Sequence, residues 1–284
     1  MTAPPSLTVE SLERLHPEWS TWLRLVSIAR RAAEDPVWQA AVPSVPPGEG
    51  TTCALVTGAE FAVDARAVTR LVGALLEAVA GAALPAEPAV RTLEAAIAQD
   101  DDSLRATART AGVDAALLGA AAPLVALPLL QACRRAWTSR IAPTWRTGAC
   151  PVCGAWAAIA EARGVERVLR LRCSRCGADW ATEPVRCPFC GEQDHEKLRA
   201  LVGDGQGDLR RVEVCDTCRG YMKTVTTLTA CAPLDVALLD VSTVDLDVAA
   251  VEHGYARPAR PLDAPRPRVV IQPARTLRGL FSRA

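Results

Sequence analysis

Four Cys-x-x-Cys pairs in the middle of the 284-residue chain constrain its fold more than any other feature. Two intervening residues allow both sulfurs of a pair to reach one tetrahedral ion, and the neighbouring proline and glycine residues favour a tight turn, called a knuckle, whose N–H groups can face the thiolates. The cysteines that we expect to bind metal are Cys150 and Cys153, Cys173 and Cys176, Cys187 and Cys190, and Cys215 and Cys218.

The spacing between these pairs favours two separate four-sulfur sites. Nineteen residues separate the first pair from the second, and twenty-four separate the third from the fourth, so each interval accommodates a short hairpin that brings two knuckles together. Joining the second pair to the third would leave only ten residues between them. We prefer the sequential pairing, because the two hairpins are then explained, although spacing alone leaves the other pairing open.

Four-sulfur tetrahedral sites suit zinc or iron, and Cys-Pro-x-Cys-Gly knuckles occur in both zinc ribbons and rubredoxin-type iron sites. Both predicted sites are closed, with four protein ligands and no open position for a hydrolytic water. The metal could therefore act as a structural staple, without any chemistry of its own. We expect a Cys→Ser change within a pair to unfold its own ribbon and to leave the helical part of the chain folded.

The N-terminal part, residues 1–145, is predicted to be an all-α domain, because its apolar residues recur at helical spacing. Asp64 and Asp114 are the expected N-caps of two of its helices, and residues 42–50 and 84–88 are expected loops. The apolar positions with this spacing are Trp19, Trp22, Leu23 and Val26, then Val68, Leu71, Val72, Leu75, Leu76 and Val79, then Val90, Leu93 and Ile97.

The next two segments, residues 146–183 and 184–231, are predicted to be tandem four-cysteine modules of similar design. Residues 167–172 alternate with strand periodicity after an Arg163-Gly164 turn, and residues 198–202 and 209–214 flank a glycine-rich turn at 203–208. Each module thus has the order knuckle, hairpin, knuckle. Residues 232–284 form the last segment, in which 234–251 are expected to be helical in part and the arginine-rich end from Arg257 a flexible basic tail.

Neither the N-terminal residues nor the most apolar stretch predicts a membrane protein. Residues 1–16 lack a basic region followed by an apolar core, and residues 115–130 are interrupted by Pro123 and Pro128 and fall short of the about 20 apolar residues that a span needs. We expect a buried core helix there, broken or kinked by proline, in a cytoplasmic protein with no membrane insertion. Reduced thiols in that compartment favour metal ligands over disulfides.

The remaining reactive side chains do not assemble into an enzyme site. Cys53 and Cys133 are expected to pack in apolar surroundings, while Cys231 lies thirteen residues after Cys218 and could approach the second site. His195 is expected in an exposed loop. The acids Asp204, Asp208, Asp245 and Asp247 are expected to cap turns or face solvent. No catalytic residues and no organic cofactor are predicted.

The motif order resembles the formate dehydrogenase accessory protein (FdhE) family, and the resemblance is specific over residues 150–255. The residues that carry it are the four cysteine pairs, Leu169 to Arg172, Trp180, Tyr221-Met222-Lys223, Leu234 to Asp240 and Glu252 to Tyr255. It implies a non-catalytic cytoplasmic factor that binds the catalytic subunit of respiratory formate dehydrogenase, with iron favoured at the cysteine sites. One departure is Arg219, where the fourth knuckle would ordinarily have glycine; a left-handed arginine predicts a looser second site.

The expected fold is therefore α+β: an N-terminal all-α domain, two tandem rubredoxin-like or zinc-ribbon metal modules, and a short C-terminal helical segment with a flexible basic tail. Two other functions stay open, a rubredoxin-like iron redox protein and a nucleic-acid-binding zinc ribbon. Balanced charge, 32 basic against 32 acidic residues, weighs against nucleic acid as a partner, and a homo-oligomer is left open. The arginines that motivate the nucleic-acid alternative are Arg167, Arg170, Arg172, Arg175 and Arg186.

Overall fold

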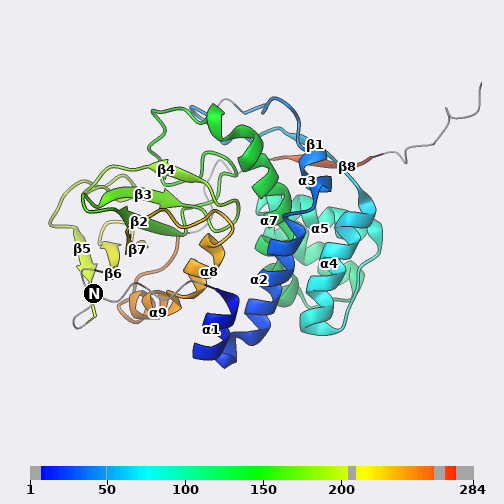
Figure 1. Ribbon diagram of the computed structural model, residues 1–284, viewed down its shortest axis with the longest axis horizontal. Helices are drawn as coiled ribbons and strands as arrows, with labels where there is room; N and C mark the ends of the chain where they lie inside the picture. Colours follow the sequence, from blue (N-terminus) through cyan, green and yellow to red (C-terminus); the bar gives the residue numbers. More distant parts are fainter. Residues whose placement is uncertain (1–7, 49, 204–208, 259–265, 273–284) are drawn as a thin grey trace, which may run out of the picture.

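A helical region and a six-stranded β-sheet lie side by side in the computed structural model, which describes residues 8–48, 50–203, 209–258 and 266–272 (Figure 1). The predicted α+β class is confirmed. The turn at 204–208, with Asp204 and Asp208, and the tail residues 259–265 and 273–284 lie outside the described residues.

Seven α-helices precede the first cysteine pair within the described ranges. Asp64 accepts hydrogen bonds from the N–H groups of Arg66 and Ala67, and Asp114 accepts one from Leu117, so both predicted N-caps are confirmed. The expected loop at 84–88 is too long, since α5 already begins at Ala86; Pro88 fits in its first turn, where the N–H that proline lacks would have no helical partner. The helices are α1 (Val9–Leu15), α2 (Ser20–Ala32), α3 (Pro36–Ala40), α4 (Ala65–Ala80), α5 (Ala86–Ala98), α6 (Asp101–Ala111) and α7 (Ala115–Trp137).

Helix α7 is the central helix of this region and packs against α2, α4, α5 and α6. It runs for 23 residues through both Pro123 and Pro128, so the helix is not broken there, and the alternative, a kink at proline, stays a prediction. Among the described residues, Ala115–Arg140 is the one helical stretch long and apolar enough to cross a membrane, and 72% of its apolar window is buried inside the protein. That burial is typical of a core helix.

The N-terminal region is not purely helical, and the C-terminal segment is not wholly a free tail. Strand β1 (Glu60–Val63) pairs in parallel with β8 (Arg268–Ile271), and the N–H of Val269 donates to Glu94 on α5 at 2.6 Å. Strand β1 was not predicted from the sequence for two reasons. It is only four residues long, which is too short for a clear alternation, and its partner lies some two hundred residues away. Residues 268–271 thereby return to the helical region.

The second layer is one continuous sheet with the strand order β4-β3-β2-β7-β6-β5. Each module contributes three adjacent strands in the same order, and β2 and β7 join the modules in parallel, whereas the other neighbours are antiparallel. The two predicted hairpins are confirmed, and each gains a third strand that the sequence pattern did not predict. The strands are β2 (Ile159–Arg163), β3 (Val168–Arg172), β4 (Asp179–Ala181), β5 (Leu198–Leu201), β6 (Arg210–Cys215) and β7 (Tyr221–Thr227).

A buried ion pair holds the joint between the two modules. Glu161 on β2 and Arg172 on β3 form this pair, with side chains 0% and 1% exposed. The Glu161 carboxylate also accepts from the Thr227 hydroxyl of β7 at 3.3 Å and from the Cys231 N–H at 2.9 Å, and Arg172 donates to the Cys231 carbonyl at 2.8 Å. Because charges this deeply buried need partners, the pair fixes β2, β3, β7 and the following segment relative to one another.

Two short helices, α8 (Val236–Val241) and α9 (Val244–Glu252), confirm the expected helical character of residues 234–251. They lie beside the sheet, on the side of α1 and α2 (Figure 1). Leu246 and Ala250 of α9 pack in a small core with Val212, Val214 and Tyr221 of the second module. The C-terminal segment is thus an integral part of the second module's packing.

Candidate metal centres

All four knuckles share one backbone geometry. The residue after each second cysteine has a positive φ, which is 70° at Gly154, 71° at Gly177, 79° at Gly191 and 58° at Arg219. Glycine is favoured at three of these positions because it adopts this conformation without steric cost. The N–H of each first cysteine donates to a carbonyl five residues later, at 2.7 to 3.1 Å. These bonds close the turns around the thiols.

The structure brings the eight paired cysteines into two groups of four, and each group can hold a metal ion. The first contains Cys150, Cys153, Cys173 and Cys176, and the second contains Cys187, Cys190, Cys215 and Cys218; within each group all Sγ atoms lie within 4.8 Å of one another. The grouping is the sequential one, with the second and third pairs in different groups.

The spacing of the sulfurs fits a tetrahedral tetrathiolate site. The nearest Sγ pairs are 3.4 and 3.5 Å apart in the first group and 3.7 Å apart, twice, in the second. Four thiolates about 2.3 Å from a zinc ion would lie roughly 3.8 Å apart. Because both groups are close to this value, the donor set and its geometry suit zinc or iron. That these eight cysteines bind an ion stays a prediction.

The first group is completely buried at the contact between the sheet and the helical region. All four of its cysteines are 0% exposed and belong to the same apolar core as the helices. The backbone of its first knuckle accepts hydrogen bonds from the N–H groups of Leu55 and Val56, at 2.8 and 3.1 Å. Arg175 of its second knuckle donates to the Ala96 carbonyl of α5. The first centre therefore links the two layers.

Burial strongly affects the thiols of the first group. It raises the pKa of Cys150 and of Cys176 well above the ordinary value, because a thiolate is poorly solvated there. Hydrogen bonds from Cys150 and Cys173 lower the pKa of Cys153. An ion bound among these sulfurs would supply the positive charge that four buried thiolates need.

The second group is open to solvent on one side. Cys187 and Cys215 are buried, whereas Cys190 and Cys218, the second cysteine of each knuckle, are exposed. Glu192 connects the two knuckles, since its carboxylate accepts from the Thr217 hydroxyl at 2.6 Å and from two backbone N–H groups of its own loop. These hydrogen bonds, that of Thr217 first, lower the pKa of Glu192 to about 2.

Arg219 adopts the left-handed conformation that the sequence analysis anticipated, and its side chain is well anchored. The guanidinium lies 4.0 Å from the centre of the Tyr255 ring. It also donates to the carbonyls of His253 and Gly254, at 3.2 and 3.1 Å, and to Asp216 at 3.2 Å. These contacts offset the backbone strain and hold the end of α9 against the fourth knuckle.

Substitutions at Arg219 separate backbone strain from side-chain contacts. Arg219→Ala keeps the left-handed residue and loses every contact, whereas Arg219→Gly loses the contacts but relieves the strain. We expect the glycine variant to be about 1 kcal/mol more stable to unfolding than the alanine variant. Chemical denaturation of both metal-loaded proteins measures this difference, and equal stabilities would show that the position carries no strain.

The predictions for the single cysteines and for His195 are confirmed only in part. Cys133 is buried on α7, as expected, whereas Cys53 is only partly buried. Cys231 lies beside Glu161 and Arg172, at the joint of the modules, and not in the second four-cysteine group. His195 is exposed, as expected.

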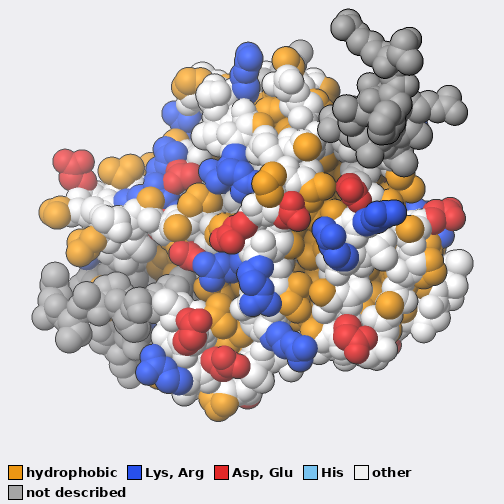
Figure 2. Space-filling view, turned by 45° about the vertical axis from the view of Figure 1, so that its right-hand side comes forward, with side chains coloured by type: hydrophobic (Ala, Val, Ile, Leu, Met, Phe, Trp, Pro, Cys, Tyr) orange, Lys and Arg blue, Asp and Glu red, His pale blue; other side chains and the backbone are white. Residues whose placement is uncertain are grey.

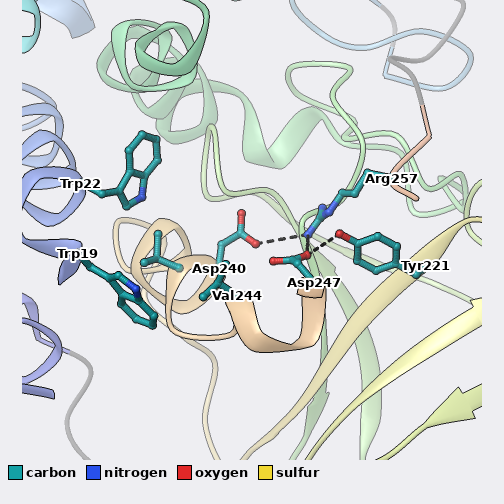
Figure 3. Close-up of a pocket in the computed structure, with 8 residues that line it drawn as sticks. Trp19, Trp22, Tyr221, Asp240, Val244, Asp247 and Arg257 are labelled. Carbon is teal, nitrogen blue, oxygen red and sulfur yellow. Dashed lines mark hydrogen bonds and ion pairs between the residues drawn. The ribbon is translucent and has the colours of Figure 1, made fainter. Parts of the chain in front are cut away.

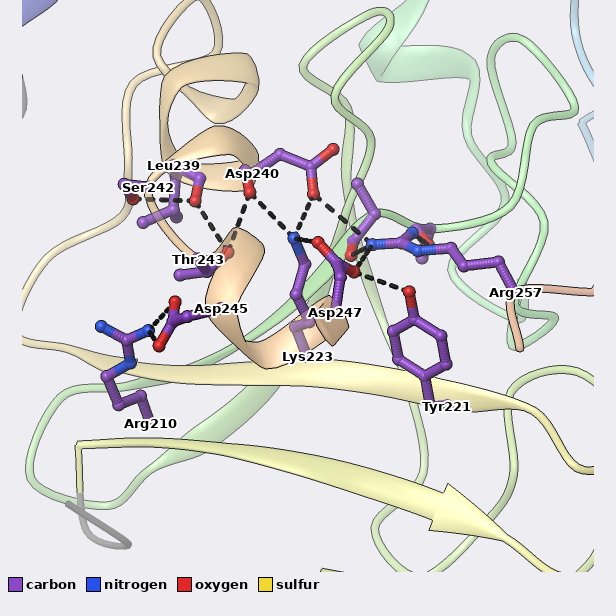
Figure 4. A network of polar contacts seen from close by, with 12 residues as sticks. Arg210, Tyr221, Lys223, Leu239, Asp240, Ser242, Thr243, Asp245, Asp247 and Arg257 are labelled. Carbon is purple, nitrogen blue, oxygen red and sulfur yellow. Dashed lines mark hydrogen bonds and ion pairs between the residues drawn. The ribbon is translucent and has the colours of Figure 1, made fainter. Parts of the chain in front are cut away.

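A buried polar network that the sequence pattern did not predict lies between β7 and the C-terminal helices (Figure 4). The side chain of Lys223 is 0% exposed, and its Nζ lies 2.7 Å from carboxylate oxygens of both Asp240 and Asp247. The Tyr221 hydroxyl donates to Asp247 at 2.7 Å, and Arg257 lies 3.4 Å from both acids. The expectation that Asp247 caps a turn or faces solvent is therefore wrong, whereas Asp245 is exposed as expected. Lys223 is one of only two lysines in the chain, and this rarity was the one sequence feature that could have pointed to the network.

This network forms one wall of a pocket of about 610 Å³, with Trp19 and Trp22 on the other side (Figure 3). Its charged groups are paired with one another: Asp240 and Asp247 with Lys223 and Arg257. Such complete pairing is typical of a network that holds elements together, here the second module and α8 and α9.

Comparison with known proteins shows which family the chain is similar to. Residues 185–262 match the model of the FdhE C-terminal domain. A Protein FdhE homolog of Pseudomonas aeruginosa is 33% identical over 114 residues, which is 38% of this chain and 37% of that protein. A Protein FdhE homolog of Stutzerimonas stutzeri is 34% identical over 114 residues, which is 39% of this chain and 36% of that protein. The alignments thus span little more than a third of each relative.

The fold is also similar to a solved structure, the crystal structure of the FdhE protein from Pseudomonas aeruginosa. The superposition covers 90% of this chain and 93% of that chain, with a TM-score of 0.52 and 23% sequence identity. At this identity the match shows a shared fold. Together with the matches in sequence, it confirms the resemblance to the FdhE family.

Proposed function

From this resemblance, we propose that the chain is a cytoplasmic accessory factor for a respiratory formate dehydrogenase. It binds the catalytic subunit of that enzyme and is needed for its active form, and it has no catalytic activity itself. The observation that carries the proposal is the pair of four-cysteine groups within a chain that has the FdhE fold.

The geometry of the centres supports a binding role over a hydrolytic one. Each group offers four thiols to one ion, which leaves no ligand position for a reactive water. An ion in such a site stabilises the fold around it. Iron is favoured over zinc by the family resemblance, while the donor set itself suits both.

The arrangement of charge argues against a nucleic-acid ribbon. Arg172 is buried against Glu161, Arg170 donates to Asp179 at 2.6 Å, and Arg186 pairs with Glu183 at 3.1 Å. On the face shown in Figure 2, basic and acidic side chains are interspersed instead of gathered by sign. Arginines paired in this way offer little to a phosphate backbone, which is bound by unpaired basic groups.

A second candidate, a rubredoxin-like redox protein, is favoured by one observation, the exposure of Cys190 and Cys218. An exposed tetrathiolate iron site lies close enough to solvent to exchange electrons with a partner. Reversible bleaching of visible absorbance on addition of dithionite to the iron-loaded protein would support this candidate, and a colourless zinc protein would exclude it.

The accessory role is tested in a strain from which the corresponding gene is deleted. Formate dehydrogenase activity should fall to background and return when the full-length chain is supplied, and tagged chain should retain the enzyme's catalytic subunit on an affinity column. A Cys53→Ser variant, altered outside both centres, is the matched control and should restore activity fully. Undiminished activity in the deletion strain would contradict the proposal.

A further inference from the structure

The two centres differ in the access that an external ligand has to their sulfurs. In the first centre every cysteine is 0% exposed, while in the second Cys190 and Cys218 are both exposed. These two side chains come from different knuckles, so they form one open edge of the second tetrahedron. The other edge, Cys187 and Cys215, is buried and holds the knuckles to the protein.

A groove also reaches the second centre from the sheet. This groove, of about 410 Å³, is lined by Cys187 and Cys215 together with Phe189 and Met222. Four arginines, Arg167, Arg186, Arg199 and Arg211, lie along it. Three of them are paired with acids: Arg186 with Glu183, Arg199 with Asp216, and Arg211 with Glu213. Four thiolates around a divalent ion would carry a net charge of about −2. With four arginines and two glutamates in its lining, the groove offsets part of this charge, even though three of the arginines are paired.

The first centre has no such approach among the described residues. Its first knuckle is covered by the backbone of residues 55 and 56, and its second by α5 through Arg175. Cys133 of α7, itself 0% exposed, lies in the same apolar core as these cysteines. An external ligand could reach these sulfurs only after the helical region had separated from the sheet, an opening that costs a large part of the unfolding free energy.

We propose that the second centre gives up its metal ion to external thiolates, which replace its cysteines as ligands. The first centre retains its ion as long as the protein is folded. In the exchange, each entering thiolate forms a bond to the ion while one cysteine releases its own bond, first Cys190 or Cys218 and then the remaining cysteines, until the ion leaves bound to external thiolates. The released sulfur takes up a proton from water, and the oxidation state of the ion does not change. The inference rests on the proposed function only in assigning metal to the eight cysteines.

Metal release from the isolated zinc-loaded protein tests this asymmetry. Dithiothreitol is the entering thiol, and a chromophoric zinc chelator records the ion that leaves. We expect two phases of one ion each, the second at least about tenfold slower, because sub-global opening costs more free energy than substitution at an exposed sulfur. The Cys190→Ser variant should lack the fast phase and keep the slow one. A Cys231→Ser variant, altered outside both centres, is the matched control and should show both phases of metal release.

Alkylation of the wild-type protein provides a second readout that does not depend on a variant folding. Iodoacetamide added during release should modify Cys190 and Cys218 first, with the cysteines of the first centre protected until the slow phase. Release of both ions in one phase would overturn the inference. Alkylation of the first-centre cysteines before Cys190 and Cys218 would do so as well. These results are independent of formate dehydrogenase, so the accessory role and the exchange can fail separately.

Discussion

Replacing Cys153 with serine should remove one metal ion and destabilise the helical region together with the sheet. The cysteine pattern alone predicts that only the ribbon unfolds, but the first centre lies within the core that it shares with the helices. Loss of its ion would leave buried thiols without their cation at the contact with α5 and α7. We expect a loss of more than about 5 kcal/mol, since structural tetrathiolate ions contribute at least that much to small folds.

Metal analysis and thermal unfolding followed by helical circular dichroism measure this effect. Cys190→Ser is the matched comparison, because it also removes a thiol from a four-cysteine group but lies at the exposed edge of the second centre. That variant should lose its own ion while the helical signal keeps a transition near the wild-type temperature. If Cys153→Ser unfolds no earlier than Cys190→Ser, the first centre does not link the two layers.

Replacing Glu161 with alanine should lower the free energy of unfolding by about 3–5 kcal/mol, which is the second largest effect that we expect. The substitution leaves Arg172 buried at 1% exposure without its carboxylate partner, and it removes the acceptor for Thr227 and the Cys231 N–H. The joint between β2, β3 and β7 would then contain an uncompensated charge. Denaturant unfolding of the metal-loaded protein measures the loss.

Two further variants make this result specific to the ion pair. Glu166→Ala removes an exposed acid from the turn of the same hairpin and should change stability by less than about 0.5 kcal/mol. The double variant Glu161→Ala with Arg172→Met should recover part of the loss, because no unpaired charge remains. If Glu161→Ala lowers the free energy of unfolding no more than Glu166→Ala does, the ion pair does not hold the joint between the modules.

The local parts of the fold could be predicted from the sequence because they depend on neighbouring residues. The knuckles follow from Cys-x-x-Cys with glycine, the hairpins from strand alternation around turns, and the N-caps from Asp64 and Asp114 before apolar helices. The same local reasoning anticipated the strained backbone at Arg219, although not the Tyr255 contact that offsets it.

The parts that could not be predicted depend on contacts between distant segments. The parallel pairing of β2 with β7 joins two modules whose sequences give no sign of a shared sheet, and β8 returns to β1 across most of the chain. Burial of the first centre likewise depends on helices outside its own motif, α7 and the more distant α5. Spacing within a motif reveals which cysteines come together, but not which group the rest of the fold covers.

The central claim, that eight cysteines form two metal centres, is tested most directly by the metal content of the native chain. The protein should be purified without oxygen, its zinc and iron determined per chain, and its thiols alkylated before and after denaturation. We predict two ions per folded chain, with Cys150, Cys153, Cys173 and Cys176 protected until denaturation. A folded chain that contains no stoichiometric metal, or whose four buried thiols react freely in the native state, would contradict the claim.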